Sequence, residues 1–302
     1  MTPLQRYIAE EIAVDHADGL IPRREALRRL ALLGFGVAAA SSLLAACASD
    51  AAAPNPTPAP PVGTPSASAA SPGRAIVVTQ AITFAGPQGR TLQGAWAPAA
   101  LPRGSVLVIH ENRGLTDHIR SVAGRLAADG YSALAIDLLS EEGGTASFSD
   151  SARATAALGA APPERLVADM RAGVGELERR QPGKKCGVIG FCFGGGMVWL
   201  LLDAGEPLLS AAVPFYGPLP DNADFAGSSA AVLAIYAELD SRVNATREAA
   251  TDALTRAGVT FEVTTFPGVN HAFFNDTGAR YDASAAADAY QKVLGWFGRH
   301  LG

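Results

Sequence analysis

The C-terminal three quarters of the chain alternates between short apolar runs and segments with a helical pattern. The apolar runs are rich in β-branched residues, and the two at 105–111 and 132–139 are nearly continuous, as expected for strands buried on both faces of a sheet. They lie at 105–111, 132–139, 186–191, 211–217, 231–238 and 261–268. Helical segments fall between them at 118–130, 163–180, 194–204 and 245–258, and a last helix ends near His300. With a hairpin expected at 75–84 and 91–98, this alternation predicts an α/β fold, with a mostly parallel central sheet and helices on both faces.

The first 47 residues have the pattern of an export signal. The pair Arg23-Arg24 precedes an apolar stretch at 30–46, which is short for a membrane-spanning helix and rich in small residues. The surroundings of the arginine pair resemble a twin-arginine export signal. The stretch ends in LLAAC, which resembles a bacterial lipobox, so we expect Cys47 to carry the lipid and become the new N-terminus. An ordinary signal peptide cut at an A-x-A site and an N-terminal membrane anchor are the alternatives.

Residues 48–73 consist mainly of alanine, proline, serine and threonine. Such a segment cannot bury enough apolar surface to fold, and its prolines keep it extended. We therefore expect a disordered tether at 48–73 and a folded domain over 74–302. This arrangement predicts an exported protein held in the cell envelope by a lipid at Cys47, with a soluble periplasmic or secreted protein as the alternative.

Composition narrows the classes of partner. The chain of 302 residues is 48% hydrophobic with a net charge of −5, and its C-terminal three quarters carries no basic cluster, which argues against nucleic acid. Three cysteines cannot form a framework of several disulfides. No His/Cys/Asp cluster has metal-ligand spacing, and no glycine-rich dinucleotide loop follows a strand, so we expect neither metal nor cofactor.

Cys192 has the surroundings of a displayed nucleophile. It lies between the strand at 186–191 and the next helix, in the pattern Gly190-x-Cys192-x-Gly194. This is the nucleophile elbow with cysteine in place of serine: the glycines let strand and helix approach closely, and the helix N-terminus stabilises a thiolate and an oxyanion. A buried structural cysteine is the alternative.

A base and an acid follow in the order that this chemistry requires. His271 lies in the loop after the last strand, where the order nucleophile, acid, histidine puts its base. Asp240 follows the strand at 231–238 and would orient the imidazole and stabilise the imidazolium. Glu238 is its local competitor, and we favour Asp240 because it lies farther into the loop.

From about residue 75 onward, the chain resembles the dienelactone hydrolase family of α/β-hydrolases. The segments that carry the resemblance are HENRGLTDHIRSVAGRLAADGYSALAIDLL, GFCFGG, AELDSRV and GVNHAFFNDTGARY. The resemblance implies an α/β-hydrolase fold and a triad of Cys192, His271 and Asp240. It also implies that Glu111 faces the thiol and takes part in its activation, a role that suits a carboxylate at a strand end. The backbone N–H groups of Asn112 and Phe193 would then form the oxyanion hole.

The chain departs from the known dienelactone hydrolases where they bind the substrate carboxylate. Those enzymes use arginines, one of them shortly after the catalytic histidine, whereas this chain has Asn275 and Asp276 in that region. The first nearby cation is Arg280, and the loop expected at 140–163 contains only Arg153. We therefore do not expect an anionic dienelactone as the natural substrate.

Other residues of reactive type receive a structural interpretation. We expect Cys186 to be an inert buried thiol, His118 to open a helix and Asp137 to hold a loop. His110 either lines the pocket or pairs with a neighbour, and Arg113 is a weak candidate for binding an anion.

The sequence thus predicts a monomeric hydrolase that cleaves a small-molecule ester, lactone or thioester through a cysteine nucleophile. A membrane-tethered binding protein on a hydrolase scaffold, with an idle thiol, is the alternative. Thiol redox chemistry is weaker because Cys186 lies a full strand length from Cys192 and is poorly placed to resolve a sulfenate.

Overall fold

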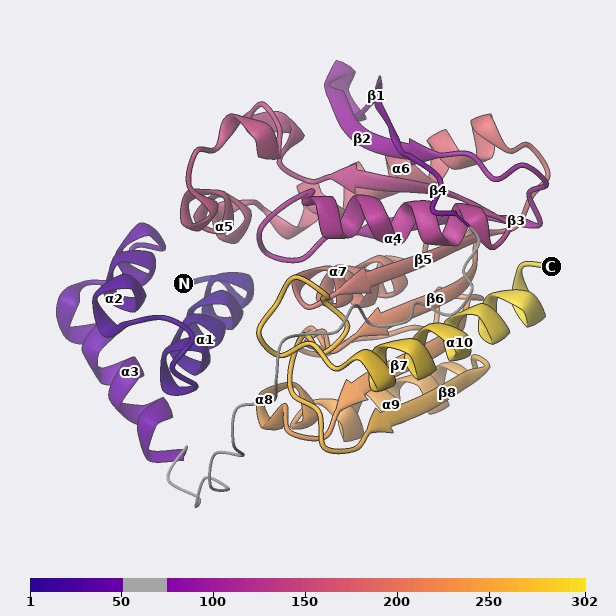
Figure 1. Ribbon diagram of the computed structural model, residues 1–302. Helices are drawn as coiled ribbons and strands as arrows, with labels where there is room; N and C mark the ends of the chain where they lie inside the picture. Colours follow the sequence, from indigo (N-terminus) through magenta and orange to yellow (C-terminus); the bar gives the residue numbers. More distant parts are fainter. Residues whose placement is uncertain (51–74) are drawn as a thin grey trace. The chain divides into compact units, whose positions relative to one another are not determined.

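A computed structural model describes residues 1–50 and 75–302, which divide into two compact units, Met1–Ala75 and Ile76–Gly302. In the N-terminal unit, the described residues form α1 (Pro3–Ala17), α2 (Arg23–Leu32) and α3 (Val37–Asp50), which pack against one another (Figure 1). In the part of the chain that the structure describes, no helix has the length and apolar character needed to cross a membrane.

The predicted export signal and tether map onto this unit only in part. The apolar stretch at 30–46 is divided between α2 and α3 by a turn at Gly34, whose φ is +92°. The backbone of Cys47 lies in α3, and the helix continues to Asp50, into the first residues of the expected tether. The remainder of the tether, 51–73, lies outside the described residues.

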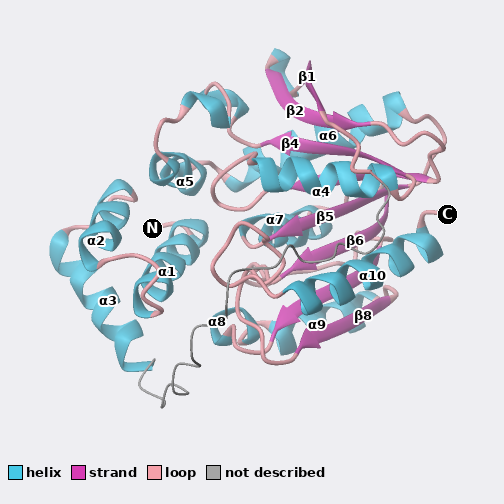
Figure 2. Ribbon diagram, in the orientation of Figure 1, coloured by secondary structure: helices cyan, strands magenta, loops and turns pink. Residues whose placement is uncertain are grey.

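The C-terminal unit is built on strands and helices in alternation (Figure 2). Its strands are β1 (Gln80–Ala85), β2 (Thr91–Ala97), β3 (Gly104–Ile109), β4 (Tyr131–Asp137), β5 (Cys186–Phe191), β6 (Leu209–Phe215), β7 (Ala231–Ala237) and β8 (Phe261–Phe266). Its α-helices are α4 (Asp117–Ala128), α5 (Ser151–Ala160), α6 (Pro163–Arg180), α7 (Phe193–Asp203), α8 (Ser241–Asn244), α9 (Arg247–Ala257) and α10 (Ala283–His300), and 3-10 turns are η1 (Pro87–Gly89), η2 (Ser140–Glu142) and η3 (Thr145–Ser147).

The described strands form one eight-stranded sheet in the order β1-β2-β4-β3-β5-β6-β7-β8. The strands from β4 to β8 in this order run parallel, while the β1–β2 hairpin is antiparallel. The parallel strands β3, β4, β5 and β7 are buried along their whole length, as their continuous apolar sequences predict. Helices α4 and α10 cover one face of the sheet and α6 and α7 the other, so the predicted α/β fold is confirmed (Figure 1).

The strand register brings the carboxyl ends of the parallel strands to one edge. Ile109, near the end of β3, pairs with Gly190 in β5, and Phe191 at the end of β5 pairs with Phe215 in β6. Ala237 at the end of β7 pairs with Phe266 at the end of β8. Residues that follow these strands therefore emerge side by side, in the crevice where α/β sheets bind ligands.

Two local expectations are corrected. The segment 140–163 is not a loop, because it contains η2, η3 and α5; the Asp150 side chain caps α5 by accepting from the Ala152 N–H at 2.9 Å. The first strand begins at Gln80 rather than at residue 75, because the preceding segment runs along α4, where the Val77 N–H donates to the Gly124 carbonyl.

Candidate active site

Cys192 occupies a strained turn between β5 and α7. It is the N-cap of α7, with φ 58° and ψ −118°, and its side chain is buried. A Cβ atom on Gly190 would overlap the Gly194 carbonyl, and a Cβ on Gly194 would overlap the carbonyl oxygens of Ile109 and His110. The two glycines of the motif are therefore required by the close approach of strand and helix, as the elbow pattern predicts.

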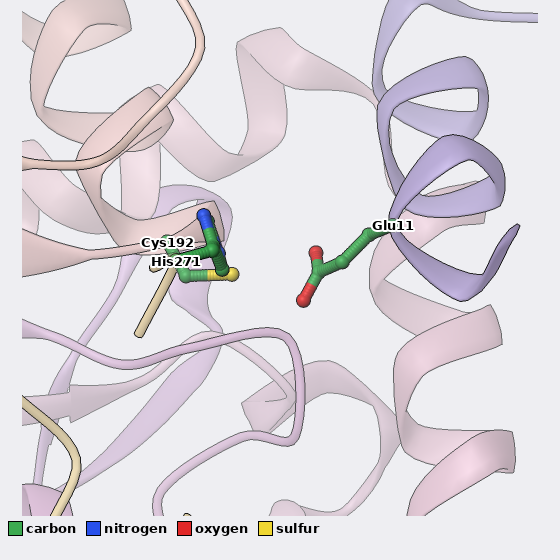
Figure 3. Close-up of side chains that lie close together, drawn as sticks. All are labelled: Glu11, Cys192 and His271. Atoms are coloured by element: carbon green, nitrogen blue, oxygen red, sulfur yellow. The ribbon is translucent and has the colours of Figure 1, made fainter. Parts of the chain in front are cut away.

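His271 lies beside this thiol, and Asp240 holds its ring. A ring nitrogen of His271 is within 4.8 Å of the Cys192 sulfur, and Figure 3 shows the two side chains adjacent. His271 Nδ1 donates to Asp240 Oδ2 at 2.5 Å, since a carboxylate can only accept. His271 Nε2 is buried and has no hydrogen-bond partner within residues 1–50 and 75–302. Nε2 is thus the nitrogen available to exchange a proton with the thiol.

Asp240 is fixed from both sides. It caps α8, where its Oδ1 accepts from the Val243 N–H at 3.3 Å, while Oδ2 binds His271. Burial acts to raise the pKa of Asp240, but the charge and the hydrogen bond of His271 outweigh it and hold this pKa below its usual value. Glu238, the competing carboxylate, is exposed and accepts from the Gly268 N–H.

Glu111 lies just past β3, with its side chain buried. Its Oε2 accepts from Asn275 Nδ2 at 2.6 Å, across 164 positions of sequence. Asn275 lies four residues after His271, so it joins the histidine loop to the end of β3. Asn275, in the region where an arginine was expected from the family resemblance, is thus a neutral amide that donates to Glu111.

The next residue, Asp276, anchors the same loop to α4. His118 Nδ1 lies 2.7 Å from Asp276 Oδ1, and the His118 ring is buried between Phe191 and Phe274. Burial lowers the pKa of His118 in spite of the neighbouring carboxylate. The loop that carries His271 is thus tied both to the end of β3 and to the helix that follows it.

Phe193 directly follows Cys192 within the elbow, and Asn112 lies in the loop after β3. Phe193 is the first residue of α7, so its N–H has no acceptor in a preceding turn of the helix. Asn112 follows Glu111, and its carbonyl oxygen accepts from Thr155 Oγ1 on α5 at 2.9 Å. An N–H from the loop after β3 and the N–H after the nucleophile are the pair that forms the oxyanion hole in α/β-hydrolases.

Tyr216 belongs to the site and was missed by the sequence analysis. It follows β6 with φ 35°, and its ring centroid is 5.0 Å from that of His271. Its hydroxyl is buried, and burial, with the charges of Glu111 and Cys192, raises the pKa of Tyr216 well above its usual value. The sequence signal that could have identified Tyr216 is its position directly after β6, the strand next to β5.

Other residues of reactive type have structural surroundings or are exposed. The Asp137 carboxylate accepts from the backbone N–H groups of Leu139 and Thr145 and holds the turn after β4. Cys186 is buried at the start of β5, and burial raises its pKa to about 12. Arg113 and Arg153 are exposed.

Comparison with known proteins gives this geometry a family. The sequence model described as "Dienelactone hydrolase family" matches residues 94–301. Relatives named "Putative carboxymethylenebutenolidase" include one from Escherichia coli O157:H7, 33% identical over 65% of this chain and 77% of its own. A second, from Methylorubrum extorquens, is 30% identical over 65% of this chain and 72% of its own.

Solved structures agree with the sequence comparison. A "Putative Dienelactone Hydrolase" from Klebsiella pneumoniae superimposes with a TM-score of 0.64 at 29% identity, covering 74% of this chain and 99% of its own. A dienelactone hydrolase-like promiscuous phosphotriesterase from metagenomic libraries gives a TM-score of 0.65 at 27% identity, covering 75% and 100%. With the sheet order and the strand-end residues described above, these matches show that the chain is a hydrolase enzyme that belongs to the dienelactone hydrolase family.

Proposed function

We propose that the protein hydrolyses an uncharged ester, lactone or thioester, with Cys192 as nucleophile, His271 as base and Asp240 as the acid that orients it. The observation that carries the proposal is the Nδ1–Asp240 bond of 2.5 Å, which leaves Nε2 of a buried histidine free beside the thiol. The relatives' name, carboxymethylenebutenolidase, supports an ester-like substrate class.

The proposed reaction proceeds through an acyl-thioester. The Cys192 sulfur bonds to the carbonyl carbon as its proton passes to His271 Nε2. The bond to the leaving oxygen, or to the leaving sulfur of a thioester, then breaks, and this atom takes the proton from His271. Water that gives a proton to His271 attacks the thioester, which releases the acid and restores the thiol. Asp240 would stabilise the imidazolium in each step.

Glu111, Asn112 and Phe193 complete the proposed machinery. The N–H groups of Asn112 and Phe193 would hold the oxyanion of both tetrahedral adducts. Glu111 is a second acceptor for the thiol proton, supported by its buried carboxylate at the end of β3. A Glu111→Gln protein that activates its thiol as fast as the wild type would remove this residue from the proposal.

The uncharged substrate is proposed from the charges around the thiol. Glu111 and Asp240 bring two carboxylates to the site. The side chain that donates a hydrogen bond to Glu111 is the neutral amide of Asn275. An anionic substrate would add a third negative charge to a buried site, which is costly without a paired cation. We therefore expect neutral lactones and aryl esters to be hydrolysed faster than a dienelactone that carries a carboxylate.

The test is hydrolysis of a small panel by the full chain, wild type beside Cys192→Ala. The panel contains aryl esters, neutral lactones and an anionic dienelactone. Turnover that disappears in Cys192→Ala, with Cys192 alkylated far faster than Cys186, is the expected result. Full turnover by Cys192→Ala would refute the mechanism, and a flat panel with a slow Cys192 would favour a binding protein.

We further propose that the protein is exported and anchored in the cell envelope by a lipid on Cys47, and that it acts as a monomer. The support is the sequence LLAAC after a short apolar stretch, followed by the Ala/Pro-rich segment 48–73. Incorporation of labelled palmitate tests the anchor, and light scattering of the purified chain tests the monomer: a mass of twice 31.0 kDa would exclude it.

A further inference from the structure

We infer that His110 is a positioning residue for the oxyanion hole: it fixes the peptide whose N–H belongs to Asn112 and packs against Phe193, which supplies the second N–H. The inference rests on the proposed function and extends it, since that mechanism assigns no step to His110. The sequence alone is compatible with a His110 that lines the pocket or pairs with a neighbour.

The two nitrogens of His110 have fixed and different roles. The side chain is fully buried; Nδ1 lies 2.6 Å from the Glu111 carbonyl oxygen, and the Leu138 N–H lies 3.1 Å from Nε2. A carbonyl oxygen can only accept and an N–H can only donate, so Nδ1 carries the proton and Nε2 does not. Burial lowers the pKa of His110, which keeps this neutral tautomer in place.

The Nδ1 bond fixes a whole peptide group. The carbonyl of Glu111 and the N–H of Asn112 belong to the same planar unit, and in a trans peptide they point in opposite directions. Since the carbonyl is held against the His110 ring, the Asn112 N–H is directed away from it. The Gly114 N–H also donates to this carbonyl, at 3.2 Å, so the plane is set by two donors.

The same ring touches the other half of the candidate hole. The His110 and Phe193 rings stack with centroids 6.0 Å apart and an interplanar angle of 11°. A Cβ atom on Gly194 would come within 2.6 Å of the His110 carbonyl oxygen, so the first turn of α7 lies directly against the end of β3. One imidazole therefore sets the relation between the two peptides that must meet at a single oxyanion.

The position of each N–H matters because an oxyanion-hole donor stabilises the oxyanion only when it lies at hydrogen-bond distance from it. Loss of one donor costs about 10²–10³-fold in turnover, and a misplacement of about 1 Å costs about 10²-fold. We expect His110→Phe, which keeps a ring against Phe193 but removes the donor to Glu111, to slow acylation of Cys192 by an aryl ester about 10²-fold with little change in KM.

Alkylation separates this role from a general effect on the site. Iodoacetamide reacts with a thiolate at a saturated carbon and forms no oxyanion, whereas an aryl ester forms one. His110→Phe should therefore alkylate Cys192 within about twofold of the wild type while its acylation falls. Replacement of His271 should slow both alkylation and acylation, because in the proposed mechanism His271 takes the proton of the thiol itself.

A pair of amides provides the rescue. The side-chain amide of His110→Asn can place a donor near the position of Nδ1, and that of His110→Gln near the position of Nε2. We expect His110→Asn to acylate at least tenfold faster than His110→Gln at equal alkylation rates. This comparison remains decisive if His110→Phe fails to fold.

Ser132→Ala is the matched control for stability. Ser132 is buried in β4, and its Oγ accepts from the Ala99 N–H at 3.0 Å, so the variant also orphans a buried N–H, but away from the elbow. It should lower the melting temperature without slowing acylation. The inference is overturned if acylation and alkylation fall in parallel in the His110 variants, or if His110→Gln acylates as fast as His110→Asn. A wild type without turnover, or a Cys192→Ala protein with full turnover, would instead refute the proposed function.

Discussion

The backbone of Cys192 has φ 58° and ψ −118°, a conformation that residues other than glycine rarely adopt. Such a conformation costs about 1–3 kcal/mol and persists only where neighbours enforce it. Here the Cys192 N–H donates to the Phe215 carbonyl, and its own carbonyl accepts from the Gly196 N–H, both at 3.1 Å. The residue is therefore held by β6 on one side and α7 on the other, with its sulfur beside His271.

Asp240→Asn tests the proposed base, His271, and the proposed role of Asp240 in orienting it. We expect a loss of about 10³–10⁴-fold in kcat, since the amide can present its N–H to Nδ1 and favour the wrong imidazole tautomer. Glu238→Gln, at the exposed carboxylate two residues away, is the control and should retain full turnover. Equal activity of the two variants would show that Asp240 does not act through His271.

The same residue makes a prediction on stability against pH. The pKa of Asp240 is depressed in the folded protein, so this carboxylate binds its proton less tightly there than in the unfolded chain. Its contribution to stability is present above the unfolded pKa, about 3.9, and is lost as the pH falls through the folded pKa. The difference in unfolding free energy between wild type and Asp240→Asn should thus shrink as the pH falls below about 5. A difference that grows on acidification would contradict the assignment.

At the scale of elements, the junction of β5 and α7 depends on glycines that leave no room for a side chain. Gly194→Ala should destabilise the fold by about 1–3 kcal/mol, because the added Cβ would strike the backbone at the end of β3. Gly175→Ala is the matched control: Gly175 lies in the exposed middle of α6, with nothing within 4 Å of an added Cβ. That variant should gain about 0.5–1 kcal/mol in chemical denaturation. Equal stability of the two variants would refute the close-packed junction.

The sequence was sufficient to predict the elements that carry the candidate triad. Strands β5 and β7 are continuous apolar runs, so their ends could be located: Cys192 directly follows β5, and Asp240 lies three residues after β7. His271 lies five residues after β8, which is only partly buried but was located by its β-branched residues. The helix α6 was also predicted with its correct bounds, since its apolar residues follow one stripe. Helix α5 was missed because SARATAALGA is alanine-rich and shows no such stripe, although Asp150 and the following prolines mark its ends.

The remaining parts of the site depend on contacts between distant segments. Asn275 holds Glu111 from 164 positions away, and the Leu138 N–H donates to His110 from 28 positions away. A residue's own neighbours in sequence carry no signal of such a partner. The contacts of Asn275, Tyr216 and His110 therefore required coordinates, whereas the proposed nucleophile and base could be selected from their places after strands.

At the scale of the whole molecule, the chain consists of an N-terminal unit and a hydrolase domain, with 51–74 between the described parts. The lipid proposal belongs to this scale, since it assigns the first unit to export and the second to chemistry. In a bacterium that processes lipoproteins, labelled palmitate should enter the wild-type chain and not Cys47→Ser. Label in Cys47→Ser, or none in the wild type, would contradict the anchor.

The most direct test of the account is the identity of the atom that receives the acyl group. The full chain is mixed with a stoichiometric aryl ester, quenched in acid within the first turnover and digested for mass spectrometry. We predict an acyl group on Cys192 and none on Cys186, with the adduct absent from Cys192→Ala. Hydrolysis with no acyl group on Cys192, or undiminished hydrolysis by Cys192→Ala, would contradict the assignment of Cys192 as the nucleophile.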